Sequence, residues 1–161
     1  MENTLIIFVH LMAAAVAIGA SVHSLLLLAP QVRQREKDSV LDENSVSYLL
    51  LDRLAPTVFV AFLVLVGSGI YFMMENYTDQ VNLPDGYYTI LGIKLIFVVA
   101  AFFCSAYQMF MLKPEIANLD LQPEKRGQVP ATLQKMATVG KAALAALSLA
   151  LFMGIYLARY G

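Results

Sequence analysis

The chain contains four long segments in which apolar residues follow one another almost without interruption, at residues 4–30, 48–74, 87–112 and 136–160. A hydrocarbon core about 30 Å thick is crossed by about 20 residues of helix, so each segment is long enough to span a bilayer. Inside lipid, backbone groups must be paired within a helix or a closed barrel, and barrel strands alternate apolar and polar residues, which these segments do not. We therefore predict an all-α fold, a single domain over residues 1–161 that forms an integral membrane bundle of four transmembrane helices in the lipid bilayer.

The composition supports a membrane protein and excludes other classes. Only 14% of the residues are charged, against roughly 25% in a soluble domain. The net charge of −1 argues against a nucleic-acid partner. Cys104 is the single cysteine, so one chain can build neither a disulfide framework nor a thiolate metal site. The first segment lacks a basic leading region and is too long for a secretory signal, so we expect it to be retained.

The Lys and Arg residues are distributed unevenly between the loops. Nine of the eleven lie in or beside the first and third loops: Arg33, Arg35, Lys37, Arg53, Lys113, Lys125, Arg126, Lys135 and Lys141. The second loop, residues 75–86, has none. Because positive loops remain cytoplasmic, we expect a multi-pass protein of the cell inner membrane with both termini outside the cytoplasm. Proline cannot continue a helix interior without losing a hydrogen bond, so Pro30 and Pro114 are expected to mark the ends of the first and third helices.

Four ionisable side chains lie at or near membrane depth: His10, His23, Arg53 and Lys94. Such groups are costly in lipid unless they find partners, so each is a candidate functional residue. At ~1.5 Å per residue, His10 lies roughly 9 Å inward from Thr4, and Lys94 roughly 10 Å inward from Tyr87, which starts on the same side of the membrane. These two residues therefore share a depth, whereas His23 belongs to the other half and Arg53 lies near the surface of that half.

The two histidines are the only ones in the chain, and both lie on the first helix. Neutral imidazole ligates iron, copper and zinc, and membrane haem b is commonly held by two axial histidines from different helices. A bis-histidine haem here would need a second subunit, which predicts a homodimer with parallel first helices. His10 and His23 are ~20 Å apart along the axis and ~140° apart around it, so one straight seam cannot present both. We expect them to serve different surroundings.

Each candidate also has an explanation without a cofactor. An intramembrane histidine can be held by a Ser, a Tyr or a carbonyl group; Arg53, beside Asp52, can be an interfacial anchor, and Lys94 can extend its ammonium to the membrane surface. Met109 and Met111 could offer thioether ligands to cuprous ion, but residues two apart on a helix point about 160° from each other.

Small residues recur every four positions in the fourth segment: Ala142, Ala146, Ala150, Gly154 and Ala158. Such a stripe lets another helix approach closely. It favours packing within the bundle, with a subunit contact or a flat cofactor against the stripe as alternatives. Ala13, Ala17 and Ala20, with Gly19, form a looser version on the first helix.

Three stretches resemble the superfamily that includes HemJ-type protoporphyrinogen oxidases and CopD-type copper-resistance membrane proteins. They are "FVHLMAAAVAIGA" in the first helix, "DRLAPTVFVAFLVLVGSGIYF" in the second and "GIKLIFVVA" in the third. The resemblance covers roughly the first two thirds of the chain. The fourth segment, "LQKMATVGKAALAALSLA", lacks the arginine-tryptophan-asparagine-glutamate-proline type of signature of the HemJ branch, and the chain has no tryptophan.

The resemblance implies a helical bundle that binds haem b, with His10 as axial ligand and Lys94 as functional lysine. We accordingly expect a haem b-binding membrane protein in redox chemistry or electron transfer, with a quinone or a redox protein as partner, His10 and His23 as metal ligands, and Lys94 and Arg53 as further cofactor-binding residues. Two alternatives follow from the branches of the superfamily. One is an oxidoreductase that converts protoporphyrinogen IX to protoporphyrin IX with Lys94 in the catalytic site, and the other is copper uptake or handling.

Overall fold

The computed structural model describes residues 2–35, 46–76 and 86–158. Within these ranges the chain is helical almost throughout and contains no strand, so the predicted all-α fold is confirmed. Its elements are α1 (Glu2–Arg35), α2 (Val46–Asn76), α3 (Tyr87–Tyr107), the π-helix η1 (Gln108–Leu112), α4 (Lys113–Leu121), the 3₁₀-helix η2 (Pro123–Gln128) and α5 (Val129–Leu157). Four helical stretches are long and apolar enough to cross a membrane, as predicted.

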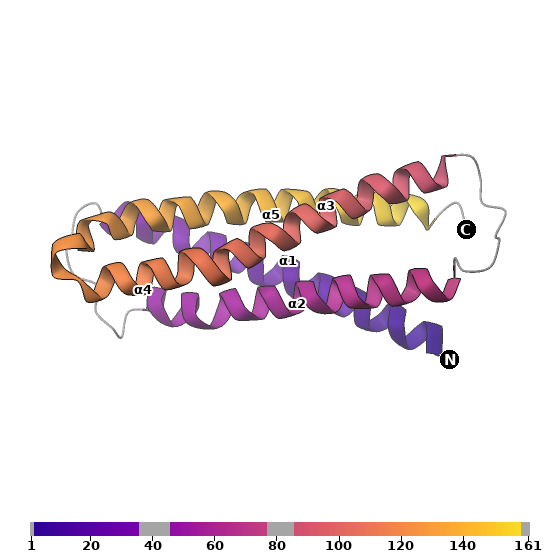
Figure 1. The fold of residues 1–161 in the computed structure, drawn as a ribbon, viewed down its shortest axis with the longest axis horizontal. Helices are drawn as coiled ribbons and strands as arrows, with labels where there is room; N and C mark the ends of the chain where they lie inside the picture. The colour runs from indigo at the N-terminus through magenta and orange to yellow at the C-terminus, as the bar shows by residue number, and fades with distance from the viewer. Residues whose placement is uncertain (1, 36–45, 77–85, 159–161) are drawn as a thin grey trace.

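The long helices run side by side along one axis (Figure 1). Both chain ends lie at the same end of the bundle, which we call the termini end, and α4 and η2 lie at the opposite end. The helices contact one another mainly as two pairs, α1 with α2 and α3 with α5, and α1 also packs against α5. Contact between α2 and α3 is sparser. The bundle is therefore two helix pairs joined chiefly along α1 and α5.

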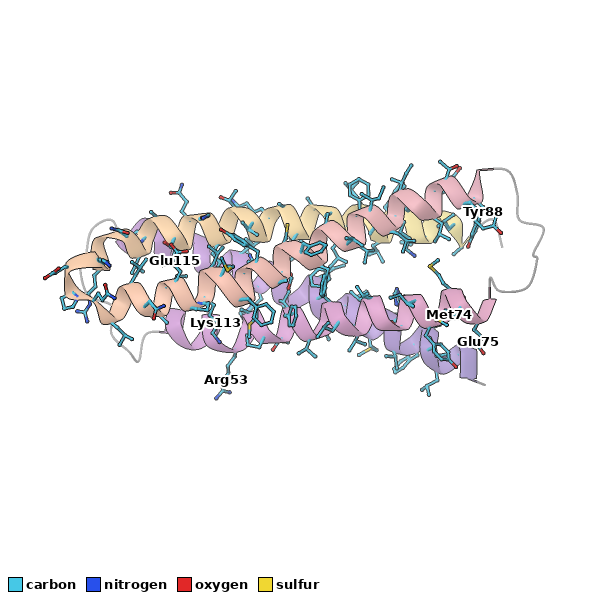
Figure 2. All side chains as sticks on the ribbon, in the orientation of Figure 1. Arg53, Met74, Glu75, Tyr88, Lys113 and Glu115 are labelled. Atoms are coloured by element: carbon cyan, nitrogen blue, oxygen red, sulfur yellow. The ribbon has the colours of Figure 1, made fainter. Side chains whose placement is uncertain are left out.

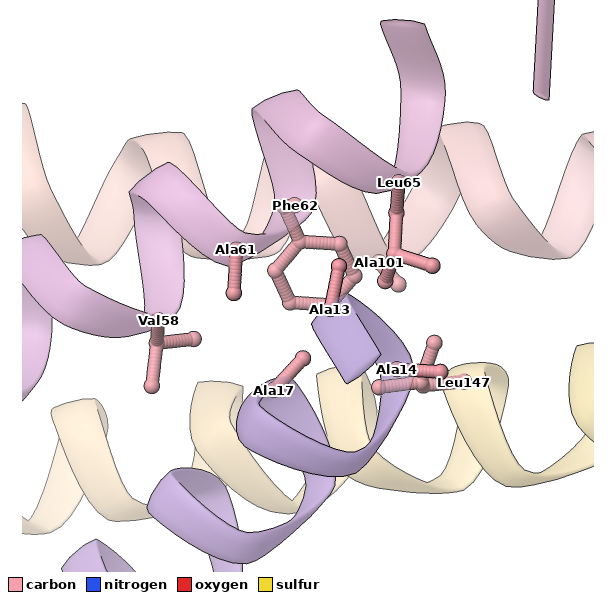
Figure 3. Packing of buried hydrophobic residues seen from close by; sticks show 9 residues of the cluster. All are labelled: Ala13, Ala14, Ala17, Val58, Ala61, Phe62, Leu65, Ala101 and Leu147. Carbon is pink, nitrogen blue, oxygen red and sulfur yellow. The ribbon is translucent and has the colours of Figure 1, made fainter. Parts of the chain in front are cut away.

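The middle of the bundle holds the main core, shown in Figure 3. Small side chains on α1, including Ala13 and Ala17, let the neighbouring helices approach, and Phe62 of α2 fills the space beside them. The other members are Ala14, Val58, Ala61, Leu65, Ala101 and Leu147. A second cluster, toward the opposite end, joins η1, α4 and α5 through Leu112, Ile116, Val129, Leu133 and Met136.

The termini end has almost no buried core. Among the described side chains of residues 4–12, 66–75, 87–100 and 151–158, Leu157 is the only one that is buried. The ribbons of the two helix pairs also diverge toward this end (Figure 1). Since protein interiors are normally close-packed, the helix pairs are held together in the middle and at the opposite end of the bundle.

Neither proline expected to mark a helix end does so. Helix α1 passes through Pro30 and continues to Arg35. One proline removes a single backbone hydrogen bond, and in lipid the other backbone groups still need helical partners. Pro114 lies in the first turn of α4, directly after the π-helix, so the third helical stretch reaches Leu121, beyond the predicted span. Pro114 has no backbone N–H to donate to the carbonyl group of Phe110, four residues earlier. That carbonyl group lies within the π-helix, whose turn is wider than that of an α-helix.

Candidate functional site

His10 lies half-buried on α1, toward the termini end, where it faces α2. Its Nδ1 atom is 2.8 Å from Oγ of Ser68. The neighbouring Gly69 brings the α2 backbone close to the ring, since a Cβ atom at that position would lie 3.6 Å from Cε1 of His10. The histidine is therefore seated against one turn of α2.

The hydrogen bonds of Ser68 favour one position for the proton of the His10 ring. The hydroxyl group of Ser68 donates to the carbonyl of Val64 at 2.6 Å, with the Leu65 carbonyl 3.2 Å away. With its single proton directed to Val64, the Ser68 oxygen is an acceptor for Nδ1–H of His10. This arrangement favours the tautomer in which Nε2 has no proton and keeps a lone pair for a ligand.

Lys94 lies half-buried on α3, where it contacts α5. A Cβ atom at Gly154 would lie 3.3 Å from Nζ and 3.5 Å from Cε of Lys94, so the absence of a side chain at Gly154 makes room for the lysine. Among the side chains that the structure describes, no carboxylate pairs with this ammonium group. The lysine is thus a partly buried cation without an acidic partner in the described part of the chain.

His10 and Lys94 are close enough to interact electrostatically. His10 is held by the α1–α2 pair and Lys94 by the α3–α5 pair, in the part of the bundle that lacks a packed core. The depth that the two residues share in the sequence therefore corresponds to a shared region of the structure. Four helices supply this candidate site.

The other two predicted site residues lie elsewhere. His23 is exposed on α1, in the half of the bundle away from the termini. Arg53 is exposed on α2, and Figure 2 shows its side chain pointing away from the bundle. Its backbone carbonyl accepts a hydrogen bond from Thr57. Neither residue joins His10 and Lys94.

Sequence reasoning missed Ser68 as the partner of His10, and it did not connect Gly154 with Lys94. A signal existed for each, because Ser68 is a polar residue between two glycines in an apolar span and Gly154 belongs to the small-residue stripe. Of that stripe, Ala146 and Ala150 face the packed bundle, whereas Ala142 and Ala158 are exposed. Ala146 and Ala150, the central residues of the stripe, thus pack within the bundle.

The donor set fits one side of a haem b group, the cofactor that the family resemblance implies. Haem iron is bound by a neutral imidazole nitrogen, and a second hydrogen bond from the other ring nitrogen commonly orients the ligand. His10 meets both conditions through Nε2 and the Ser68 contact. A cationic side chain for a propionate is present in Lys94. Within the described ranges, no group of three or more His, Cys, Asp or Glu side chains is arranged to hold a bare metal ion.

No model of a known protein family matches the chain, and neither a curated protein nor a solved structure matches it.

Proposed function

We propose that the chain is a haem b-binding membrane protein that takes part in electron transfer, with His10 as an axial ligand. The observation that carries this proposal is the hydrogen bond from Nδ1 of His10 to Ser68, whose own proton is donated to the Val64 carbonyl. It leaves Nε2 as the basic nitrogen, as iron ligation requires. When bound, the haem iron would accept and release one electron at a time.

Lys94 has a binding role in this proposal. Its ammonium group has no carboxylate partner among the described side chains and lies near His10, so it would pair with a propionate group or another anion at the same depth. The absence of a side chain at Gly154 leaves room for Lys94 against α5. His10 and Lys94 are both half-buried, and the burial of a haem is one of the factors that set its reduction potential.

The test is the absorption spectrum of the detergent-purified protein from haem-replete cells, recorded oxidised and reduced. The proposal predicts haem b bands in the wild-type protein and their loss in His10→Ala. Ser148→Ala is a control for a substitution within a membrane-spanning helix, because Ser148 of α5 is exposed and lies outside the candidate site. A colourless wild-type protein would contradict the proposal.

Oxidation of protoporphyrinogen IX is the second candidate function. It is supported by the nearness of Lys94 to the imidazole of His10. A tetrapyrrole substrate carries carboxylate groups that Lys94 could bind beside this imidazole. Porphyrin turnover that requires both His10 and Lys94 would favour this function. Haem bands without turnover would favour electron transfer, with a quinone or a redox protein as the partner.

We further propose that two copies pair through α1. Ala15, Gly19 and His23 lie four residues apart on one face of this helix, and all three are exposed in the single chain. A second copy would cover a histidine that otherwise faces lipid, and small residues allow the close approach. Two parallel α1 helices would bring the His23 side chains toward each other, which makes His23 a ligand or hydrogen-bonding residue of the dimer.

The basic residues support an orientation with both termini outside the cytoplasm of the cell inner membrane. Lys125 and Arg126 of η2 lie at the end of the bundle opposite the termini, and Lys113 begins α4 there. By the positive-inside rule this end faces the cytoplasm. A reporter enzyme fused to the C-terminus tests the orientation, because the proposal requires activity on the non-cytoplasmic side.

A further inference from the structure

An open cavity of about 360 Å³ lies at the end of the bundle opposite the termini, along η1 and α4. One part of its lining is apolar, formed by Phe110, Met111 and Leu119. Phe110 and Met111 are each 60% exposed, although both are large apolar side chains. This wall is therefore suited to contact with hydrocarbon.

The rest of the lining is polar. Asn118 and Gln122 offer amide groups, and Lys125 of η2 adds a cation. In sequence order, Phe110 is the first residue of the lining and Lys125 is the last. Glu115 also lines the cavity, and its carboxylate has an electrostatic interaction with the ammonium of Lys135 on α5, whose main partner is the Tyr107 side chain. Lys125, which follows Glu115 further along the chain, supplies the cation of this part of the cavity.

The depth of the cavity in a bilayer follows from the length of the helices. Tyr87 and Tyr88 start α3 at the termini end, and such aromatic residues anchor at the level of the headgroups. A whole bilayer of about 40–45 Å corresponds to roughly 27–30 residues of helix, which places the opposite headgroup level near residues 113–116. Figure 2 shows Lys113 and Glu115 in the part of the bundle away from Tyr88. The cavity thus extends across this level, with Phe110 and Met111 on the side of the acyl chains.

We propose that this cavity is a binding site for an anionic phospholipid. The phosphate group pairs with Lys125 and accepts hydrogen bonds from the amide groups of Asn118 and Gln122, and the first part of an acyl chain lies against Phe110 and Met111. The order of these residues along the chain matches the order of a lipid from acyl chain to headgroup. This site is separate from His10 and does not depend on haem binding.

The experiment uses the full chain, purified in an uncharged detergent, and measures its unfolding temperature after addition of phosphatidylglycerol, phosphatidylcholine or glycerol 3-phosphate. Phosphatidylglycerol at a hundredfold excess over Kd is expected to raise the unfolding temperature by about 5 °C or more, whereas the other two compounds leave it unchanged. Native mass spectrometry counts the lipid molecules that remain bound.

Two lysine variants make the test specific. Lys125→Gln is expected to weaken phosphatidylglycerol binding about fivefold, as one basic residue at a membrane surface contributes. Lys141→Gln is the matched control, because Lys141 is exposed on α5 and does not line the cavity. Both lysines are exposed, so both variants should fold. Equal stabilisation by phosphatidylcholine, stabilisation by glycerol 3-phosphate alone, or an unchanged affinity of Lys125→Gln would each overturn the proposal.

Discussion

Lys94 of α3 lies against Gly154 of α5, where a Cβ atom would come within 3.3 Å of the ammonium nitrogen. Because the neighbour is the end of a flexible side chain, Gly154→Ala should cost less than about 1 kcal/mol of unfolding free energy. Gly154→Leu should displace the lysine and cost about 1–3 kcal/mol, as overpacking does. Combining Gly154→Leu with Lys94→Ala should recover most of that loss. Reversible unfolding in mixed micelles measures the coupling, and strictly additive effects would contradict the contact.

Ser68→Ala tests how the His10 ring is oriented. Removal of a group that orients a metal ligand commonly lowers metal affinity 10–100-fold, so this variant should bind haem more weakly by such a factor. Haem titration into the apoprotein measures the affinity. Ser148→Ala should bind like the wild-type protein. Equal affinities of Ser68→Ala and Ser148→Ala would show that the hydrogen bond does not orient a ligand.

The contact between α5 and the π-helix leaves little room for a side chain at Gly140. The side-chain amide of Gln108 donates to the Met136 carbonyl at 2.8 Å, and a Cβ atom at Gly140 would lie 3.0 Å from that amide nitrogen. Gly140→Ala should therefore be less stable than Gly92→Ala by about 1 kcal/mol, the net contribution of one hydrogen bond, because both changes gain the same helix preference. Gly92→Ala should leave stability unchanged or raise it, because a Cβ atom there meets no neighbour and alanine favours helix.

Gly19→Leu tests pairing of two chains through α1. A Cβ atom at Gly19 has no neighbour within 4 Å in the single chain, so a larger side chain should leave the bundle intact and hinder close approach of a second copy. We expect a shift from dimer to monomer in light scattering. Gly67→Leu of α2 is the control, since Gly67 is equally open and lies on another helix. A monomeric wild-type protein, or a dimer that tolerates Gly19→Leu, would contradict the pairing.

The fold followed from the sequence because lipid leaves few alternatives to a bundle of helices. The shared depth of His10 and Lys94 was also readable, since depth depends only on helical rise. Their actual neighbours, Ser68 and Gly154, depend on how each helix is rotated about its axis, which packing decides. The continuation of α1 through Pro30 was missed for a related reason: a local rule against proline was overridden by the need to pair backbone groups in lipid.

The π-helix at Gln108 had no sequence signal other than the proline that follows at Pro114. The exposure of His23 and Arg53 was equally hidden, because an ionisable residue in an apolar segment can face either the bundle or its surroundings. The sequence therefore predicts which residues are candidates, and the packing separates His10 and Lys94 from the other two.

The reduced-minus-oxidised absorption spectrum of the purified protein, with the haem-to-chain ratio, is the decisive measurement of haem binding at His10. We expect haem b bands in the wild-type protein and their retention in His23→Ala. In His10→Ala the bands should be lost while the helical circular dichroism is unchanged. Haem bands that survive in His10→Ala, or a wild-type protein without haem from haem-replete cells, would contradict haem binding at His10.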